Sequence, residues 1–156
     1  MIRLIMFIAT GAYTGYLPKA PGTWGSLVAL PLNLLLIRLS ATNHGLALAG
    51  IFLLAVYTAG AAEKILDRQD PGAIVIDEII GMLIALVAVP AQPLLWLIAF
   101  LLFRLFDIMK PWPVSWADRH LHGGLGIVLD DVLAGAYTWL VLQGILALLP
   151  ALHAAP

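Results

Sequence analysis

The sequence predicts an all-α fold, a polytopic bundle of membrane helices, and composition is the first observation behind this prediction. Of its 156 residues, 62% are hydrophobic and only 11% are charged. Soluble domains are about 45–50% apolar and about 25% charged. The mean hydropathy of +1.00 agrees with this excess. We therefore expect a bilayer rather than water to surround a single domain covering residues 1–156.

The second observation is a series of apolar stretches separated by polar turns. The stretches cover residues 25–39, 45–62, 73–89, 93–109 and 125–149. Chains inside a bilayer must satisfy their own backbone polar groups, so each stretch is expected to be helical. The middle three would be about 25 Å long, slightly less than the ~30 Å hydrocarbon core. About five short or tilted spans are therefore predicted.

The segment 2–17 is also apolar, but Gly11 and Gly15 interrupt it. We expect it to be interfacial or re-entrant rather than a sixth span. A further crossing here would scatter the basic residues over both membrane faces. With five crossings, they gather on one face.

The third observation is this distribution of basic residues. Five crossings leave only Arg38 on one face of the membrane. The other seven basic residues lie on the opposite face: Arg3, Lys19, Lys64, Arg68, Arg104, Lys110 and Arg119. An excess of Lys and Arg in short loops marks the cytoplasmic side. The net charge is −1 and no long basic run exists, so no nucleic-acid partner is expected.

Two pairs of acids interrupt the apolar stretches. Asp77-Glu78 and Asp130-Asp131 each follow three apolar residues. An ionised residue at the centre of an inserted helix costs about 2.5–3.5 kcal/mol, so these acids indicate a function. For either pair alone, attraction to the dipole of a helix N-terminus is an alternative explanation.

Small residues follow both acid pairs, three to five positions after the acids. Gly81 comes after the first pair, and Ala134 and Gly135 come after the second. Small side chains allow membrane helices to approach closely. We therefore expect the two acid pairs to be brought together.

A third candidate segment closes the stretch 93–109. Arg104 and Asp107 are three residues apart, and Lys110 is three residues further on. Residues at this spacing share a helix face, so a local ion pair at the helix end is one interpretation. The other is a phosphate site in which Arg104 and Lys110 bind the phosphate oxygens. Pro111 is expected to end the helix.

Two glycine-containing segments complete the candidates. The first, residues 21–26, precedes an apolar stretch and offers Thr23 and Ser26 to a phosphate, although it lacks the Gly-Lys-Ser/Thr ending of a Walker loop. A capped turn is the alternative there. The second, residues 118–126, contains His122, which could be a proton donor or an ordinary loop residue.

Five crossings place all these motifs on the same face of the membrane. The five candidate catalytic residues are Asp77, Glu78, Asp107, Asp130 and Asp131. Hard oxygen ligands of this kind suit Mg²⁺ or Mn²⁺. The absence of cysteine excludes disulfides, thiolate zinc sites and a cysteine nucleophile. The expected metal ligands are Glu78, Asp107, Asp130 and Asp131.

The motifs at 21–26, 76–82, 103–113 and 122–135 resemble, in this order, those of the phosphatidylglycerophosphatase A family. The resemblance covers about residues 16–140. It implies a Mg²⁺-dependent hydrolase of the bacterial inner membrane, acting in phospholipid biosynthesis. Its substrate would be phosphatidylglycerophosphate, and its products phosphatidylglycerol and phosphate. Whether water or an aspartate is the nucleophile stays open.

Three other functions fit parts of the sequence. A small ion- or proton-coupled transporter subunit would use the acids as an ion pathway. A structural membrane protein would pair them with Arg104 and Lys110. A lipid phosphotransferase that uses a cytidine nucleotide is the third, but this chain lacks the Asp-Gly-x-x-Ala-Arg signature expected of that class. Clustering of the acids at one face favours the phosphatase.

Overall fold

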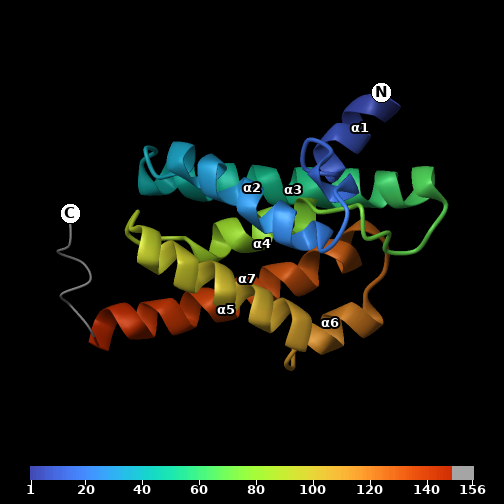
Figure 1. Ribbon diagram of the computed structural model, residues 1–156. Coiled ribbons are helices and arrows are strands. Elements are labelled where there is room, and N and C mark those ends of the chain that lie inside the picture. Colours follow the sequence, from blue (N-terminus) through green and yellow to red (C-terminus); the bar gives the residue numbers. More distant parts are fainter. Residues whose placement is uncertain (149–156) are drawn as a thin grey trace.

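The structure, a computed structural model, describes residues 1–148 and contains only helices in that range, which confirms the all-α prediction (Figure 1). The elements in chain order are α1 (Ile2–Ala9), a 3₁₀ turn η1 (Thr14–Tyr16), α2 (Pro21–Leu36), α3 (Ala41–Leu66), α4 (Ile76–Ala85), α5 (Pro93–Met109), α6 (Val114–His120) and α7 (Gly123–Leu148). Residue 149, the last of the predicted stretch 125–149, lies outside the described residues.

The short helix α4 occupies the centre of the bundle, with α2, α3, α5 and α7 packed around it (Figure 1). Eight of its ten residues are buried. At about 15 Å it is far shorter than the predicted stretch 73–89 and cannot cross a bilayer alone. The residues before it form a loop, in which the Val75 N–H donates to the Ala9 carbonyl over 2.9 Å. After it, Ala88 has a φ of 56° and cannot continue a helix.

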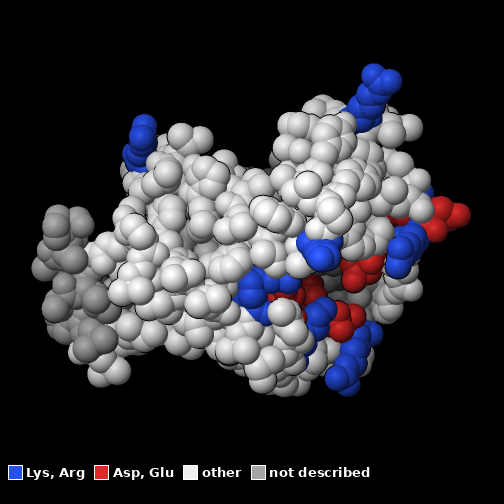
Figure 2. Space-filling model, viewed as in Figure 1, with Lys and Arg blue, Asp and Glu red and all other residues white. Residues whose placement is uncertain are grey.

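Two helices among the described residues are long and apolar enough to cross a membrane, α3 and α7. Only 22% of the most apolar 18 residues of α3 are buried, whereas the core helix of a soluble protein is mostly buried. Leu53 and Leu101 are examples of the apolar side chains exposed on α3 and α5. Most of the surface in Figure 2 is uncharged. These features favour a bilayer, while the count of five spans stays a prediction.

The N-terminal segment does not run through the bundle. Helix α1 has eight residues, about 12 Å, and the chain then turns back through Gly11, which has a φ of 54°. Exposed Ile2, Leu4 and Phe7 leave one side of α1 unpacked. This short, partly exposed helix agrees with an interfacial segment rather than a span.

Glycines allow the central helices to touch, as predicted from the small residues after the acid pairs. A Cβ on Gly135 of α7 would lie 2.2 Å from the Gly81 carbonyl oxygen of α4. A Cβ on Gly124 would lie 1.9 Å from the Val56 carbonyl oxygen of α3. Any larger residue would push these backbones apart. Residues 123–126, expected as part of a bent loop, instead form the first turn of α7. Their glycines allow this turn to pack closely against its neighbours.

One end of the bundle carries the polar residues. The starts of α2, α4 and α7 and the end of α5 all meet there (Figure 1). Lys, Arg, Asp and Glu gather over this end in Figure 2. Arg38 follows α2 at the opposite end. A helix that was not predicted, α6, covers the polar end between α5 and α7.

Candidate active site

The first acid pair begins the central helix. Asp77 and Glu78 stand in the first turn of α4, where the helix dipole favours negative charge. The dipole explanation therefore fits this pair. It does not explain their burial, because Asp77 is only 8% exposed.

The second acid pair lies inside α7, beyond its first turn, so the dipole explanation fails for Asp130 and Asp131. Neighbouring residues on a helix point about 100° apart, and these two carboxylates have different partners. Asp131 approaches Asp77 and Glu78. Asp130 instead accepts a hydrogen bond from Lys110 over 2.8 Å.

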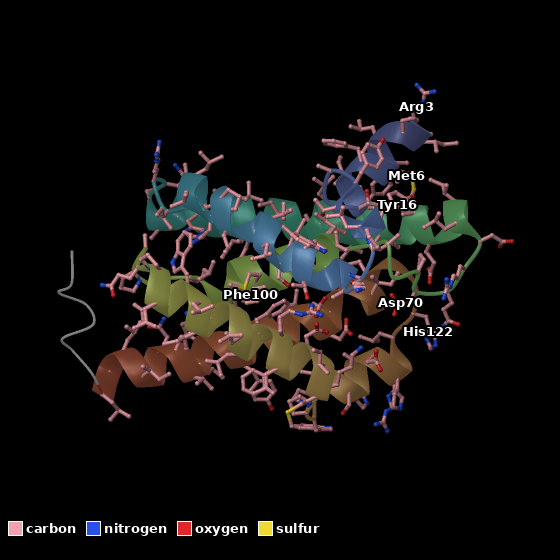
Figure 3. All side chains as sticks on the ribbon, in the orientation of Figure 1. Arg3, Met6, Tyr16, Asp70, Phe100 and His122 are labelled. Atoms are coloured by element: carbon pink, nitrogen blue, oxygen red, sulfur yellow. The ribbon has the colours of Figure 1, made fainter. Side chains whose placement is uncertain are left out.

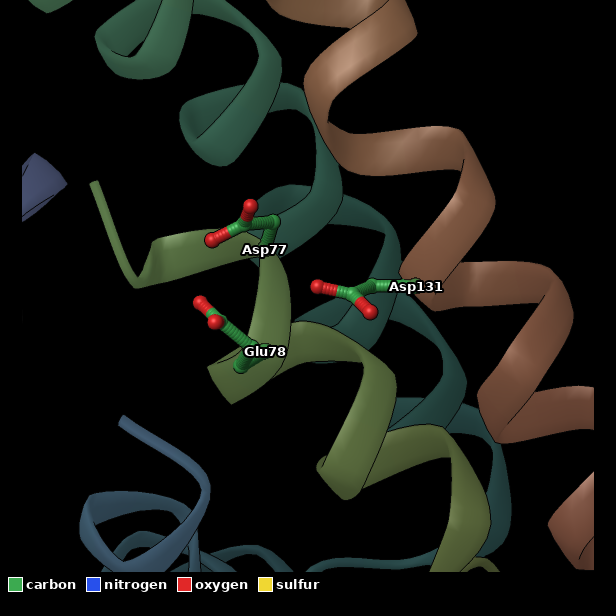
Figure 4. Close-up of side chains that lie close together, drawn as sticks. All are labelled: Asp77, Glu78 and Asp131. Carbon is green, nitrogen blue, oxygen red and sulfur yellow. The ribbon is translucent and has the colours of Figure 1, made fainter. Parts of the chain in front are cut away.

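Three carboxylates form a cluster that suits a cation (Figure 4). Asp77, Glu78 and Asp131 each offer an oxygen, and these oxygens lie within 4.8 Å of one another. One buried oxygen of each has no hydrogen-bond partner among the described residues: Asp77 Oδ1, Glu78 Oε2 and Asp131 Oδ1. Buried like charges repel unless a counter-charge joins them. Hard oxygen donors of this kind fit Mg²⁺ or Mn²⁺.

Arg104 links this cluster to α5. Its guanidinium lies 2.6 Å from Asp107 Oδ2, one helical turn away, and 3.8 Å from Glu78 Oε1. The local ion pair considered from the sequence is therefore present, and it extends to α4. Gly22 of α2 lies directly against both groups, because a Cβ there would be 2.0 Å from Glu78 Oε1 and 2.8 Å from Arg104 Nη1.

Lys110, just beyond α5, joins α6 to α7. Its ammonium donates to Asp118 Oδ1 and to Asp130 Oδ2. Burial alone would lower the pKa of Lys110, but the two carboxylates outweigh it and raise that pKa above its ordinary value. The ammonium therefore stays charged throughout the physiological range.

A cavity of about 310 Å³ opens beside Asp130 at the polar end. Its lining includes His122, Asp118, Glu63 and Asp70. Asp70 and His122 are labelled at the polar end in Figure 3. The sequence did not single out Asp118, Glu63 or Asp70. Each lies in a charged segment where nothing distinguishes it from a solvated residue, and only the fold brings these segments together.

Thr23 and Ser26 lie in the first turns of α2. Ser26 is fully buried, and its hydroxyl donates to the Gly22 carbonyl over 2.8 Å. Thr23 is half-buried at the polar end. Gly22, which precedes Thr23, lies directly against Glu78 and Arg104. The lack of a side chain at residue 22 therefore leaves room for Glu78 and Arg104.

Comparison with known proteins identifies the family. Residues 7–146 match the family described as Phosphatidylglycerophosphatase A. The chain belongs to the phosphatidylglycerophosphatase A family. Membership of the phosphatidylglycerophosphatase A family places the chain among phosphatases, which confirms the prediction of an enzyme.

Individual relatives agree. The Phosphatidylglycerophosphatase A of Escherichia coli is 41% identical over 82% of this chain and 75% of its own length. That of Haemophilus influenzae is 38% identical over 93% and 90%. A Bacteroides thetaiotaomicron protein provisionally named a phosphatidylinositol-3-phosphatase is 37% identical over 89% and 91%. No solved structure gives a significant match.

Proposed function

We propose that the protein hydrolyses the terminal phosphomonoester of phosphatidylglycerophosphate to phosphatidylglycerol and phosphate, with Mg²⁺ as cofactor. The observation that carries the proposal is the cluster of Asp77, Glu78 and Asp131 beside Arg104 in a chain of this family. The acids lie at one end of the bundle rather than along it. This arrangement favours an enzyme over a transporter with an ion pathway through the midplane.

The unpaired oxygens of Asp77, Glu78 and Asp131 fit the metal and would hold it. This set shares Glu78 and Asp131 with the set expected from the sequence. Asp107 and Asp130, also expected as ligands, contact Arg104 and Lys110. When bound, the metal supplies positive charge that stabilises negative charge developing on the phosphate oxygens.

The cationic side chains bind and orient the substrate phosphate. Arg104 presents planar donors that match phosphate oxygens, and Asp107 holds the guanidinium in place over 2.6 Å. Lys110 adds a point charge whose position is fixed by Asp118 and Asp130. Thr23 at the start of α2 completes the proposed phosphate contacts. Ser26, the fourth residue of the predicted set, is fully buried and its hydroxyl donates to the Gly22 carbonyl instead.

The reaction adds water across the ester bond. Oxygen from water joins phosphorus, the bond from phosphorus to the glycerol oxygen breaks, and that oxygen takes a proton. His122 borders the cavity beside Asp130 and is proposed to donate this proton. Fixed charges at the phosphate lower the barrier because they need no reorganisation during the reaction.

The proposed setting is the inner membrane of a bacterium, with several spans and the site at the cytoplasmic face. The concentration of basic residues at the polar end supports this orientation. A headgroup at the interface would reach the carboxylates while its acyl chains remain in the bilayer. Because the carboxylates lie at the polar end of the bundle, they would be at the depth of that headgroup.

Phosphate release from phosphatidylglycerophosphate by the purified protein in nanodiscs tests the proposal. We expect release with Mg²⁺, loss with chelator, and slower release from phosphatidylinositol 3-phosphate. Mg²⁺ should also raise the melting temperature of the wild type and not of the Asp131→Asn variant, because binding stabilises the folded state. Full activity after exhaustive metal removal would reject the metal, and faster release from the inositol lipid would reassign the substrate.

A further inference from the structure

An apolar groove of about 490 Å³ runs along the outside of α2 and α5. Leu27, Leu30 and Leu34 form its α2 wall, and Leu97 and Phe100 belong to its α5 wall. Figure 3 shows Phe100 between the two helices. Every side chain lining the groove is apolar or aromatic, so the groove suits a hydrocarbon ligand.

On α2 the helix face that lines the groove continues to the candidate active site. Leu34, Leu30 and Leu27 follow one another at spacings of four and three residues, so they share a helix face. Four residues before Leu27, the same stripe reaches Thr23. Thr23 adjoins Gly22, which touches Glu78 and Arg104.

On α5, which runs in the opposite direction, the same continuity holds. Leu97 and Phe100 line the groove, and Arg104 is the next residue of this stripe, four positions after Phe100. Asp107 then follows at a spacing of three. On both helices, the stripe that lines the groove therefore continues one turn further to a residue of the proposed phosphate site.

The groove extends away from the site along both helices. On α2 its lining runs from Leu27 to Leu34, seven residues or about 10 Å along the helix, and Thr23 lies one further turn towards the site. At the end far from the site, Ala91, Pro93 and Trp96 line the groove. A lipid whose phosphate lies at Arg104 would thus have room for an acyl chain along the groove.

We propose that this groove binds one acyl chain of the lipid phosphomonoester and positions its headgroup for hydrolysis, an inference that rests on the proposed function. The groove selects the substrate from bulk lipid because headgroup and chain are bound by the same two helices. Bulk lipid and a second copy of the protein are the competing occupants, and the experiments below separate them.

Fluorescence tests binding without hydrolysis. A phosphonate analogue of phosphatidylglycerophosphate with brominated acyl chains is added to nanodiscs at low mole fraction. The Trp96 signal is the difference between the wild type and Trp96→Phe. We expect this signal to be quenched several-fold more strongly than by brominated phosphatidylcholine. Equal quenching by both lipids would overturn the proposal, because it is what ordinary bilayer exposure gives.

Kinetics test positioning with a matched pair of variants. Leu97 and Leu101 are both exposed on α5, 53% and 57%, but only Leu97 lines the groove. We measure the ratio of kcat/KM for dipalmitoyl- over dihexanoyl-phosphatidylglycerophosphate. Leu97→Trp should lower this ratio at least about tenfold, the effect of a misfit in an apolar pocket, and Leu101→Trp should preserve it. Similar ratios in both variants would overturn the proposal.

Two further outcomes are informative. Preferential quenching without phosphate release by the wild type would reject the proposed reaction and retain the groove as a lipid site. Crosslinking of Leu97→Cys chains into dimers, without preferential quenching, would assign the groove to a second copy of the protein and overturn the inference.

Discussion

At the scale of single residues, the adjacent acids Asp130 and Asp131 contact different parts of the site. Asp131 belongs to the carboxylate cluster, whereas Asp130 pairs with Lys110 and borders the cavity. The step of about 100° between helical neighbours produces this division. Replacing either acid therefore disturbs a different part of the site.

The carboxylate cluster should not tolerate amides. Asp77→Asn, Glu78→Gln and Asp131→Asn keep the side-chain size but remove the charge that fits a cation. We expect each to lower kcat about a hundredfold or more, as for other strong electrostatic contributors. Phosphate release measures this, and circular dichroism checks the fold.

Asp67→Asn provides the matched control, because Asp67 is an exposed acid that lines neither the cluster nor the cavity. Its rate should equal that of the wild type. Wild-type rates in all three cluster variants would place the active site elsewhere.

Arg104 should not be replaceable by lysine. Arg104→Lys retains the charge but loses the planar guanidinium, which contacts Asp107 and which we propose also binds the phosphate. We expect kcat/KM of the lysine variant to fall about tenfold or more, because an ammonium cannot replace the paired donors of the guanidinium. Steady-state kinetics on phosphatidylglycerophosphate give this number. A fully active lysine variant would leave Arg104 as a helix-end charge alone.

At the scale of elements, the sequence predicted which helices meet but not how long each one is. The apolar stretches located α3, α5 and α7, and the small residues after the acid pairs predicted the contact of Gly81 with Gly135. The length of α4 was missed because a hydrophobic pattern does not separate helix from buried loop. Asp118 was missed because its contact with Lys110 depends on how α6 folds back.

The contact between α4 and α7 should depend on Gly135. A Cβ there would meet the Gly81 carbonyl oxygen at 2.2 Å, so Gly135→Ala must separate the helices. We expect about 1–3 kcal/mol of destabilisation and a loss of activity, because Asp131 moves away from Asp77. Thermal unfolding in detergent measures the first effect.

Gly144→Ala on the same helix is the control, because nothing lies within 4 Å of a Cβ there. It should leave activity intact and keep or slightly raise the melting temperature. Equal stability of the two alanine variants would show that α4 and α7 need no close contact.

At the scale of the whole molecule, the fold separates an apolar body from one polar end. The bundle brings four motifs from distant parts of the sequence to that end. The prediction that they share a membrane face rests on five crossings and stays a prediction. The contacts of the individual residues could not be predicted from the sequence. Residue spacing predicts which side chains share a helix face, but not which residue of another helix each one contacts. Lys110 and Asp130, twenty positions apart, illustrate the point.

The polar end should face the cytoplasm. Arg68 lies in the exposed loop between α3 and α4 at that end, and Ala91 is exposed in the loop between α4 and α5 at the other. The chain has no cysteine, so a single introduced cysteine has no background. Arg68→Cys should be shielded from an impermeant thiol reagent added to intact spheroplasts, and Ala91→Cys should be labelled. The reverse pattern would place the carboxylates on the outer face, and labelling at both positions would show that α4 and its flanking loops do not complete a crossing.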